Sequence, residues 1–153
     1  MSDWEDLEEL WSKNPRLRTW LTTQEAAFPG WVAETGQEWD FSTRSLQSLA
    51  LWIRGRFASA EQVRAQREDP AVAVPAWYLG EVKNRHAGTI WQCRPNLDPE
   101  VSSDPFVITP ITEAQLVRLE QCGELSDEED HRPSWHPIDE LIEVARRDRE
   151  HHL

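Results

Sequence analysis

The sequence predicts an α+β fold, with one mostly helical domain built around a short antiparallel β-hairpin or small sheet. Apolar residues recur at separations of three and four along most of the chain, which is the period of a helix packed on one face. Residues 89–94 show the two-residue alternation of a half-buried strand, and residues 106–109, which are ended by Pro110, are predicted to form a second strand. A length of 153 residues suits a single domain with one core.

The stretch 76–94 is expected to organise this fold. Its apolar residues have helical spacing and predict a helix buried on more than one side: Val74, Trp77, Tyr78, Leu79 and Val82. Gly80 lies inside that stripe, where glycine costs roughly 1 kcal/mol relative to alanine, so we interpret it as a point where another backbone approaches closely. The helix is expected to end at Gly88 and to pass almost directly into the first strand.

Residues 1–38 are expected to form an N-terminal helical extension. Ser2 and Glu5 have the spacing of a capping box at the start of a first helix. A second short helix is predicted over residues 15–21, because proline is well tolerated at a first helical position. The sequence Phe-Pro-Gly-Trp at 28–31 indicates a turn.

Residues 39–123 are expected to form the core. Capping residues open its helices, namely Ser42, the pair Ser59 and Gln62, and the pair Thr112 and Gln115. The central helix either begins near Val74 or bends at Pro75, because proline disfavours a helix interior. The two strands most simply form an antiparallel hairpin that helices must cover on one face.

The C-terminal part divides into two predicted segments. Residues 124–136 begin with five carboxylates in seven residues and are expected to be an exposed acidic linker. Residues 137–150 are predicted to form a final helix, because Pro137 suits its first position and apolar residues then recur at helical spacing.

Several of these residues form a recognisable combination. It consists of Asp40-Phe41-Ser42 followed by Ser45-Leu46 and Leu49, then Tyr78-x-Gly80-Glu81-Val82, then Gly88-x-x-Trp91, then Pro-Phe-Val at 105–107 and Pro110. This combination resembles a broad group of small uncharacterised bacterial domains, some of them similar to immunity proteins encoded beside toxins. The resemblance covers residues 39–123 and implies no catalytic residue.

Composition limits the kinds of partner. The net charge of −12 argues against direct contact with nucleic acid or anionic membranes and suits a basic protein partner. The sequence shows neither a signal peptide nor a membrane span, and two distant cysteines fit reduced thiols, so a cytoplasmic location is expected. Nine tryptophans against one tyrosine predict a core of few, large side chains.

Glu81 is the most suggestive single residue for chemistry. A carboxylate beside Leu79 and Val82 is expected to be partly desolvated, which is where perturbed acid-base behaviour arises. We favour the interpretation that it is a structural acceptor for backbone or tryptophan N–H groups of the adjoining strand. The alternative is a small enzyme or ligand-binding domain with a pocket near Glu81 and His86.

No metal, cofactor or catalytic residue is predicted. The soft ligands and nucleophiles are scattered through the chain: His86, Cys93, Cys122, His131 and His136. Their spacing does not match a zinc site, and Pro133 prevents the last two histidines from sharing a helical face. Cys93 is more simply a small core residue than a nucleophile.

The sequence therefore predicts a non-catalytic, acidic protein-binding module, of the immunity or antitoxin type, that neutralises a basic partner. The expected contact residues are Trp52, Trp135 and the acidic run Asp127, Glu128, Glu129 and Asp130. The expected structural core is Tyr78, Gly80, Glu81 and Trp91. A structural subunit of a larger assembly is a further alternative, and the sequence leaves the oligomeric state open.

Overall fold

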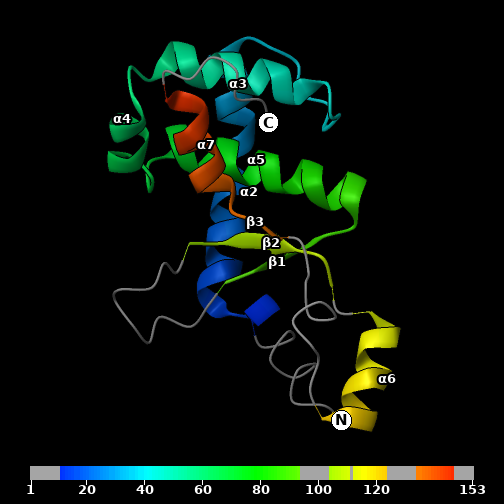
Figure 1. Ribbon diagram of the computed structural model, residues 1–153. Helices are drawn as coiled ribbons and strands as arrows, with labels where there is room; N and C mark the ends of the chain where they lie inside the picture. The colour runs from blue at the N-terminus through cyan, green and yellow to red at the C-terminus, as the bar shows by residue number, and fades with distance from the viewer. Residues whose placement is uncertain (1–10, 94–103, 111, 124–133, 147–153) are drawn as a thin grey trace.

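The computed structural model describes residues 11–93, 104–110, 112–123 and 134–146. It is mostly helical and contains one small antiparallel sheet (Figure 1), which confirms the predicted fold class. The elements in chain order are α2 (Pro15–Thr35), α3 (Ser45–Arg56), α4 (Ala60–Ala65), α5 (Pro70–Ala87), β1 (Ile90–Gln92), β2 (Phe106–Ile108), α6 (Glu113–Cys122), β3 (Ser134–Trp135) and α7 (Pro137–Ala145).

The sheet has three antiparallel strands in the order β1-β2-β3. Trp91 of β1 pairs with Val107 of β2, which pairs in turn with Trp135 of β3. The predicted β1–β2 hairpin is thus confirmed. The third strand was not predicted, because a two-residue strand is too short to show an alternating pattern and lies inside the segment 124–136 that was expected to be a linker.

Helix α5 is the central element and packs against α2, α7 and the sheet. It begins earlier than the predicted start near Val74, because the side chain of Asp69 accepts a hydrogen bond from the Ala71 N–H (2.9 Å) and Pro70 occupies the first position. The helix continues through Pro75, whose missing N–H removes one helical hydrogen bond. It ends, as predicted, at Gly88, which has the left-handed φ of 69°.

Helix α2 corrects the prediction for the N-terminal region. It is a single helix of 21 residues, so the turn predicted at 28–31 and the short helix ending near residue 21 are wrong. Pro29 and Gly30 are exposed, whereas Phe28 packs against Trp77 with ring centroids 5.2 Å apart and Trp31 is buried. Burial of these rings on the inner face outweighs the helix-breaking tendency of the two residues on the outer face.

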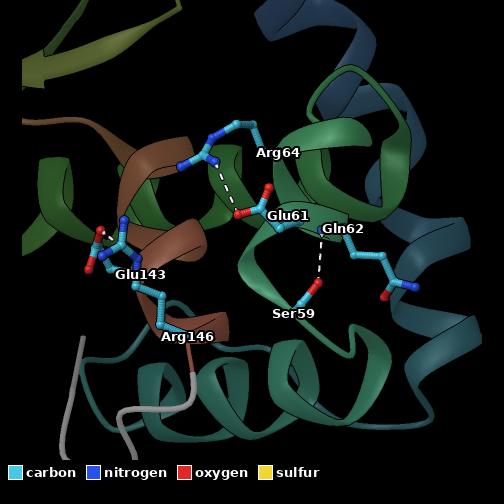
Figure 2. A network of polar contacts seen from close by, with 6 residues as sticks. All are labelled: Ser59, Glu61, Gln62, Arg64, Glu143 and Arg146. Carbon is cyan, nitrogen blue, oxygen red and sulfur yellow. Dashed lines mark hydrogen bonds and ion pairs between the residues drawn. The ribbon is translucent and has the colours of Figure 1, made fainter.

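Helices α3 and α4 pack against α7 at one end of the molecule. The predicted capping of α4 is confirmed, because Ser59 Oγ accepts a hydrogen bond from the Gln62 N–H at 3.2 Å (Figure 2). Figure 2 also shows the ion pairs Arg64–Glu61 (3.6 Å) and Arg146–Glu143 (3.2 Å) on α4 and α7. Both pairs are well exposed, so they contribute little to stability.

Helix α6 lies to one side of the sheet, away from α3, α4 and α7 (Figure 1). Its predicted cap is confirmed by two reciprocal bonds, from Thr112 N–H to Gln115 Oε1 (2.8 Å) and from Gln115 N–H to Thr112 Oγ1 (3.1 Å). The predicted capping box of Ser2 and Glu5 lies outside the described residues, as does the acidic part of the linker.

Candidate functional site

Tyr78 stands at the centre of an aromatic cluster and is fully buried (0% exposed). Four rings surround it at centroid distances of 4.8–6.2 Å: Phe28, Trp31, Trp39 and Phe41. The cluster joins α2, α5 and the segment that connects α2 to α3. The predicted contribution of large aromatic side chains to the core is thereby confirmed, but they are not few residues packed alone, because most of the buried apolar residues described are aliphatic.

The hydroxyl of Tyr78 belongs to a closed chain of hydrogen bonds. It accepts from the Phe41 N–H at 2.9 Å and lies 2.6 Å from Ser45 Oγ. Because Ser45 Oγ donates its own proton to the Ser42 carbonyl (2.6 Å), Tyr78 must be the donor to Ser45. Burial raises the pKa of Tyr78, which keeps that proton in place. The hydroxyl therefore ties α5 to the start of α3.

The hydrogen bonds through Tyr78 hold Phe41, which has a strained backbone conformation. Its φ of 61° is left-handed, which is unusual for a bulky side chain and costs about 1–3 kcal/mol. Tyr78 holds its N–H, and His86 Nε2 lies 2.8 Å from its carbonyl oxygen, so the ring nitrogen is the donor there. The guanidinium of Arg85 covers its ring at 3.7 Å. Strain of this kind persists only because the surrounding contacts fix both sides of the residue.

Asp40 supports the same segment from its outer side. Its Oδ1 accepts from the Ser42 N–H at 3.0 Å. Hydrogen bonds from the Ser42 side chain and backbone hold the pKa of Asp40 below its usual value. The residues that carried the family resemblance at 40–45 thus act together as a structural turn.

Gly80 and Trp91 form the contact between α5 and β1. A Cβ atom at position 80 would overlap Cζ2 and Cη2 of the Trp91 indole, so a close approach is confirmed, but it is to a side chain and not to a backbone. With the amide of Asn84 oriented so that its Nδ2 faces Thr89, Asn84 Oδ1 accepts from Trp91 Nε1 at 3.1 Å. The predicted acceptor for this indole, Glu81, is therefore wrong, and Asn84 takes that role.

Glu81 is half-buried at the edge of this core. Within the described ranges no hydrogen bond or ion pair reaches its carboxylate. Burial raises the pKa of Glu81, the positive charge of Arg85 opposes that shift, and Glu25 on α2 adds to it. Residues 81 and 86 are five apart, which places them about 140° from each other around the helix. Glu81 and His86 therefore do not converge.

The predicted contact residues are placed separately. Trp52 on α3 is half-buried against Trp31 (5.3 Å between centroids), and Trp135 on β3 is half-buried beneath the Lys83 ammonium (5.1 Å). No ring contact joins the two tryptophans among the residues described. The acidic run Asp127 to Asp130 lies outside the described residues.

Sequence reasoning missed two residues that the structure singles out. Leu51 is 69% exposed, next to Trp52 on the outer side of α3, and its place outside the apolar stripe of Leu46, Leu49 and Ile53 could have indicated this. Glu140 at the start of α7 is buried enough to raise its pKa, with Lys83 opposing the shift. Its Oε2 has no hydrogen-bond partner in the described part of the molecule.

A pocket of about 510 Å³ opens between the N-terminal half of α2 and the adjoining ends of β1 and β2. Its lining residues are Pro15, Arg16, Thr19, Trp20, Thr23, Gln24, Cys93 and Pro105. Neither Glu81 nor His86 lines this pocket. The pKa of Cys93 is raised by burial, despite the charge of Arg16, so its thiol is neutral and acts as an apolar wall.

The described ranges contain no group of three or more His, Cys, Asp or Glu side chains that could hold a metal ion. No helix in these ranges is long and apolar enough to cross a membrane. Comparisons of the chain with protein-family models, with curated proteins and with solved structures gave no significant match. The family resemblance therefore stays a prediction.

Proposed function

We propose that this protein is a non-catalytic protein-binding module, of the immunity or antitoxin type, that neutralises a basic partner. The distribution of charge carries the proposal. The described residues hold 14 acidic and 12 basic side chains, so they account for only 2 of the 12 net negative charges. Residues 1–10 and 124–133 hold five acids each, and Arg132 is the only basic residue in either segment.

A charge distribution of this kind favours a binding role over solubility alone. Acidic residues that only kept the protein soluble would be spread over its surface, whereas these are concentrated in two short segments. Concentrated charge of one sign accelerates the encounter with an oppositely charged protein. We therefore assign the steering of the partner to the run Asp127 to Asp130.

The use of the other suggestive residues supports a role without catalysis. Tyr78, Gly80 and Trp91 are all engaged in holding α5 against its neighbours. His86 contacts the Phe41 carbonyl and does not meet Glu81. Two polar side chains of the central helix, Tyr78 and His86, thus hold the Phe41 backbone, whereas Glu81 has no bonded partner among the described residues.

The outer face of α3 is the proposed source of short-range affinity. Leu51 is the most exposed large apolar side chain of the described residues, and Trp52 beside it is only half-buried. Indoles are among the side chains that supply much of the binding energy in protein interfaces, and the exposed Leu51 enlarges the apolar surface beside the indole of Trp52. Charge would thus set the rate of association, and this apolar pair would set the rate of dissociation.

The test uses the purified product of the neighbouring gene and a variant that neutralises the acidic run, with Asp127→Asn, Glu128→Gln, Glu129→Gln and Asp130→Asn. We expect the association rate constant at low salt to fall on the order of tenfold and to lose most of its dependence on ionic strength. The matched control removes four exposed charges elsewhere, with Glu34→Gln, Glu38→Gln, Glu68→Gln and Glu120→Gln. It should lower that constant by no more than about twofold.

Three outcomes decide the proposal. The absence of any complex with the neighbouring product would overturn the immunity reading. Equal losses in the two variants would show that only net charge matters and would remove the assigned role of residues 127–130. A further variant, Leu51→Gln, is expected to raise the dissociation rate constant while the association rate stays unchanged, and an unchanged dissociation rate would exclude the α3 face.

A further inference from the structure

We infer that the pocket between α2 and the sheet binds a small planar molecule with an amide edge, in which an N–H donor lies beside a carbonyl acceptor. Gln24 carries this inference. Its side chain is 5% exposed and lines the pocket, and its amide has no hydrogen-bond partner among the residues described. An amide at a position that is only 5% exposed and that bonds to no described protein group can pair only with water or with a molecule in the pocket, so a ligand that supplies both hydrogen bonds would replace that water.

The chemistry of glutamine selects the ligand class. Its amide presents an N–H donor and a carbonyl acceptor side by side in one plane. A lactam or similar cyclic amide presents the complementary pair, so two parallel hydrogen bonds can form. A ligand with a donor alone, or an acceptor alone, would leave half of the buried amide unpaired.

The walls of the pocket fit a flat, mostly apolar body. The indole of Trp20 offers a planar surface, and the rings of Pro15 and Pro105 and the neutral thiol of Cys93 add apolar ones. A volume of about 510 Å³ lies in the range of small-molecule sites and accommodates a two-ring molecule.

One wall of the pocket is also fixed in place. Trp20 packs edge-on against Trp91 with ring centroids 5.3 Å apart. The indole of Trp91 in turn packs directly on Gly80, where no side chain is in the way, and donates a hydrogen bond to Asn84. A wall that is rigid before binding lowers the entropy cost of association. The core contact between α5 and β1 therefore supports the pocket, and this inference does not depend on the proposed protein partner.

The experiment measures the binding of isoquinolin-1(2H)-one, a two-ring lactam, to the full chain by isothermal titration calorimetry. The matched ligand is N-methylisoquinolin-1-one, which has the same ring system and carbonyl but no N–H donor. We expect the lactam to bind and the N-methyl compound to bind at least about tenfold more weakly. Equal affinity for both compounds, or binding of neither at the solubility limit, would overturn the inference.

Protein variants test Gln24 itself. Gln24→Leu and Gln24→Met keep the approximate size of the side chain and remove the amide, so both should lower lactam affinity about tenfold. Thr22→Leu is the control, because position 22 is exposed on the same helix and does not line the pocket. It should leave the affinity unchanged.

The melting temperature of the free protein separates a ligand site from a purely structural role. Because the amide bonds to no described protein group and position 24 is only 5% exposed, an apolar Leu there loses no protein hydrogen bond and buries apolar surface, so Gln24→Leu is expected to raise Tm by about 2–4 °C while it removes binding. A structural role for the amide predicts the opposite sign. A lower Tm in both Gln24→Leu and Gln24→Met would therefore overturn the inference.

Discussion

Two buried polar side chains on neighbouring helices are treated in opposite ways. Tyr78 of α5 is 0% exposed, and its hydroxyl both accepts from Phe41 and donates to Ser45. Gln24 of α2 is 5% exposed, and its amide has no partner in the described part of the chain. The helices that carry them pack against each other. The same helix pair thus contains one polar side chain whose hydrogen bonds are all formed within the protein and one that forms none with the described residues.

The difference teaches where this fold has room for a further function. Around Tyr78 the aromatic rings fill the space, and at Gly80 not even one methyl group fits. Around Gln24 there is a cavity of about 510 Å³. An orphaned polar atom alone is not sufficient, since Trp31 Nε1 also lacks a partner within the described residues but does not line the pocket. A candidate binding site needs both a polar group without a protein partner and a cavity beside it, whereas an unpaired polar atom without a cavity is only an unsatisfied group of the core.

The largest expected effect comes from adding a methyl group where the packing is already tight, at the contact between Gly80 and Trp91. Gly80→Ala would place a methyl group inside the Trp91 indole, so either the ring or the helix must move. We expect the free energy of unfolding to fall by about 3 kcal/mol, measured by urea denaturation. Gly55→Ala is the matched control, because a Cβ there meets nothing within 4 Å and the position is exposed on α3. That change should stabilise the protein by up to about 1 kcal/mol.

A small loss of stability in Gly80→Ala would contradict the contrast between the tightly packed region around Tyr78 and the pocket beside Gln24. It would mean that Trp91 can shift at little cost, and so that the α5–β1 contact is not tightly packed. Trp20 would then also lose its fixed support, because the two indoles are in edge contact.

The second-largest effect is expected from removing the Tyr78 hydroxyl, which ties α5 to the start of α3. Tyr78→Phe leaves the Phe41 N–H without its acceptor and Ser45 without its donor. We expect a loss of about 2 kcal/mol of unfolding free energy, opposite in sign to the change expected for Gln24→Leu. Thr23→Val, which removes an exposed hydroxyl that donates to the Thr19 carbonyl, should cost no more than roughly 0.5 kcal/mol. Equal costs for the two hydroxyl deletions would contradict the structural role of Tyr78.

Local sequence signals predicted much of this fold. The helix that ends at Gly88, the β1–β2 hairpin, and the caps at Ser59 and Thr112 follow from patterns within a few residues, and all are confirmed. The turn predicted at 28–31 is wrong because Phe28 and Trp31 gain more from packing on α5 than Pro29 loses locally. That gain depends on residues about 50 positions away, which no local pattern contains.

The candidate sites were harder to predict for the same reason. Gln24 is one polar residue on a helix, and its isolation depends on Cys93 and Pro105, which lie far away in sequence. The acceptor for Trp91 Nε1 is the side-chain amide of Asn84 on the preceding helix, whereas the sequence predicts the carboxylate of Glu81. Residue types show which side chains can accept a hydrogen bond. They do not show which side chain of α5 faces the Trp91 indole, because that depends on how the chain turns between α5 and β1.

The smallest expected effect concerns Glu81, which is half-buried on α5. Burial raises its pKa above the ordinary value of 4.5, and no hydrogen bond stabilises its charge within the described residues. The folded protein therefore binds this proton more tightly than the unfolded chain does, so the contribution of Glu81 to stability falls as pH rises from about 4.5 through the raised pKa. At neutral pH, Glu81→Gln should stabilise the protein by roughly 0.5 kcal/mol.

The pH dependence identifies the cause of that change. Unfolding free energies of the two proteins should converge as pH falls below 4.5, where Glu81 is protonated in both the folded and the unfolded state. Glu34→Gln, at an exposed position of α2, should show no such convergence beyond the general effect of one charge. A loss of stability in Glu81→Gln at neutral pH would mean that the carboxylate is engaged after all. In that case Glu81 would belong with Tyr78 among the polar groups whose hydrogen bonds hold the fold together.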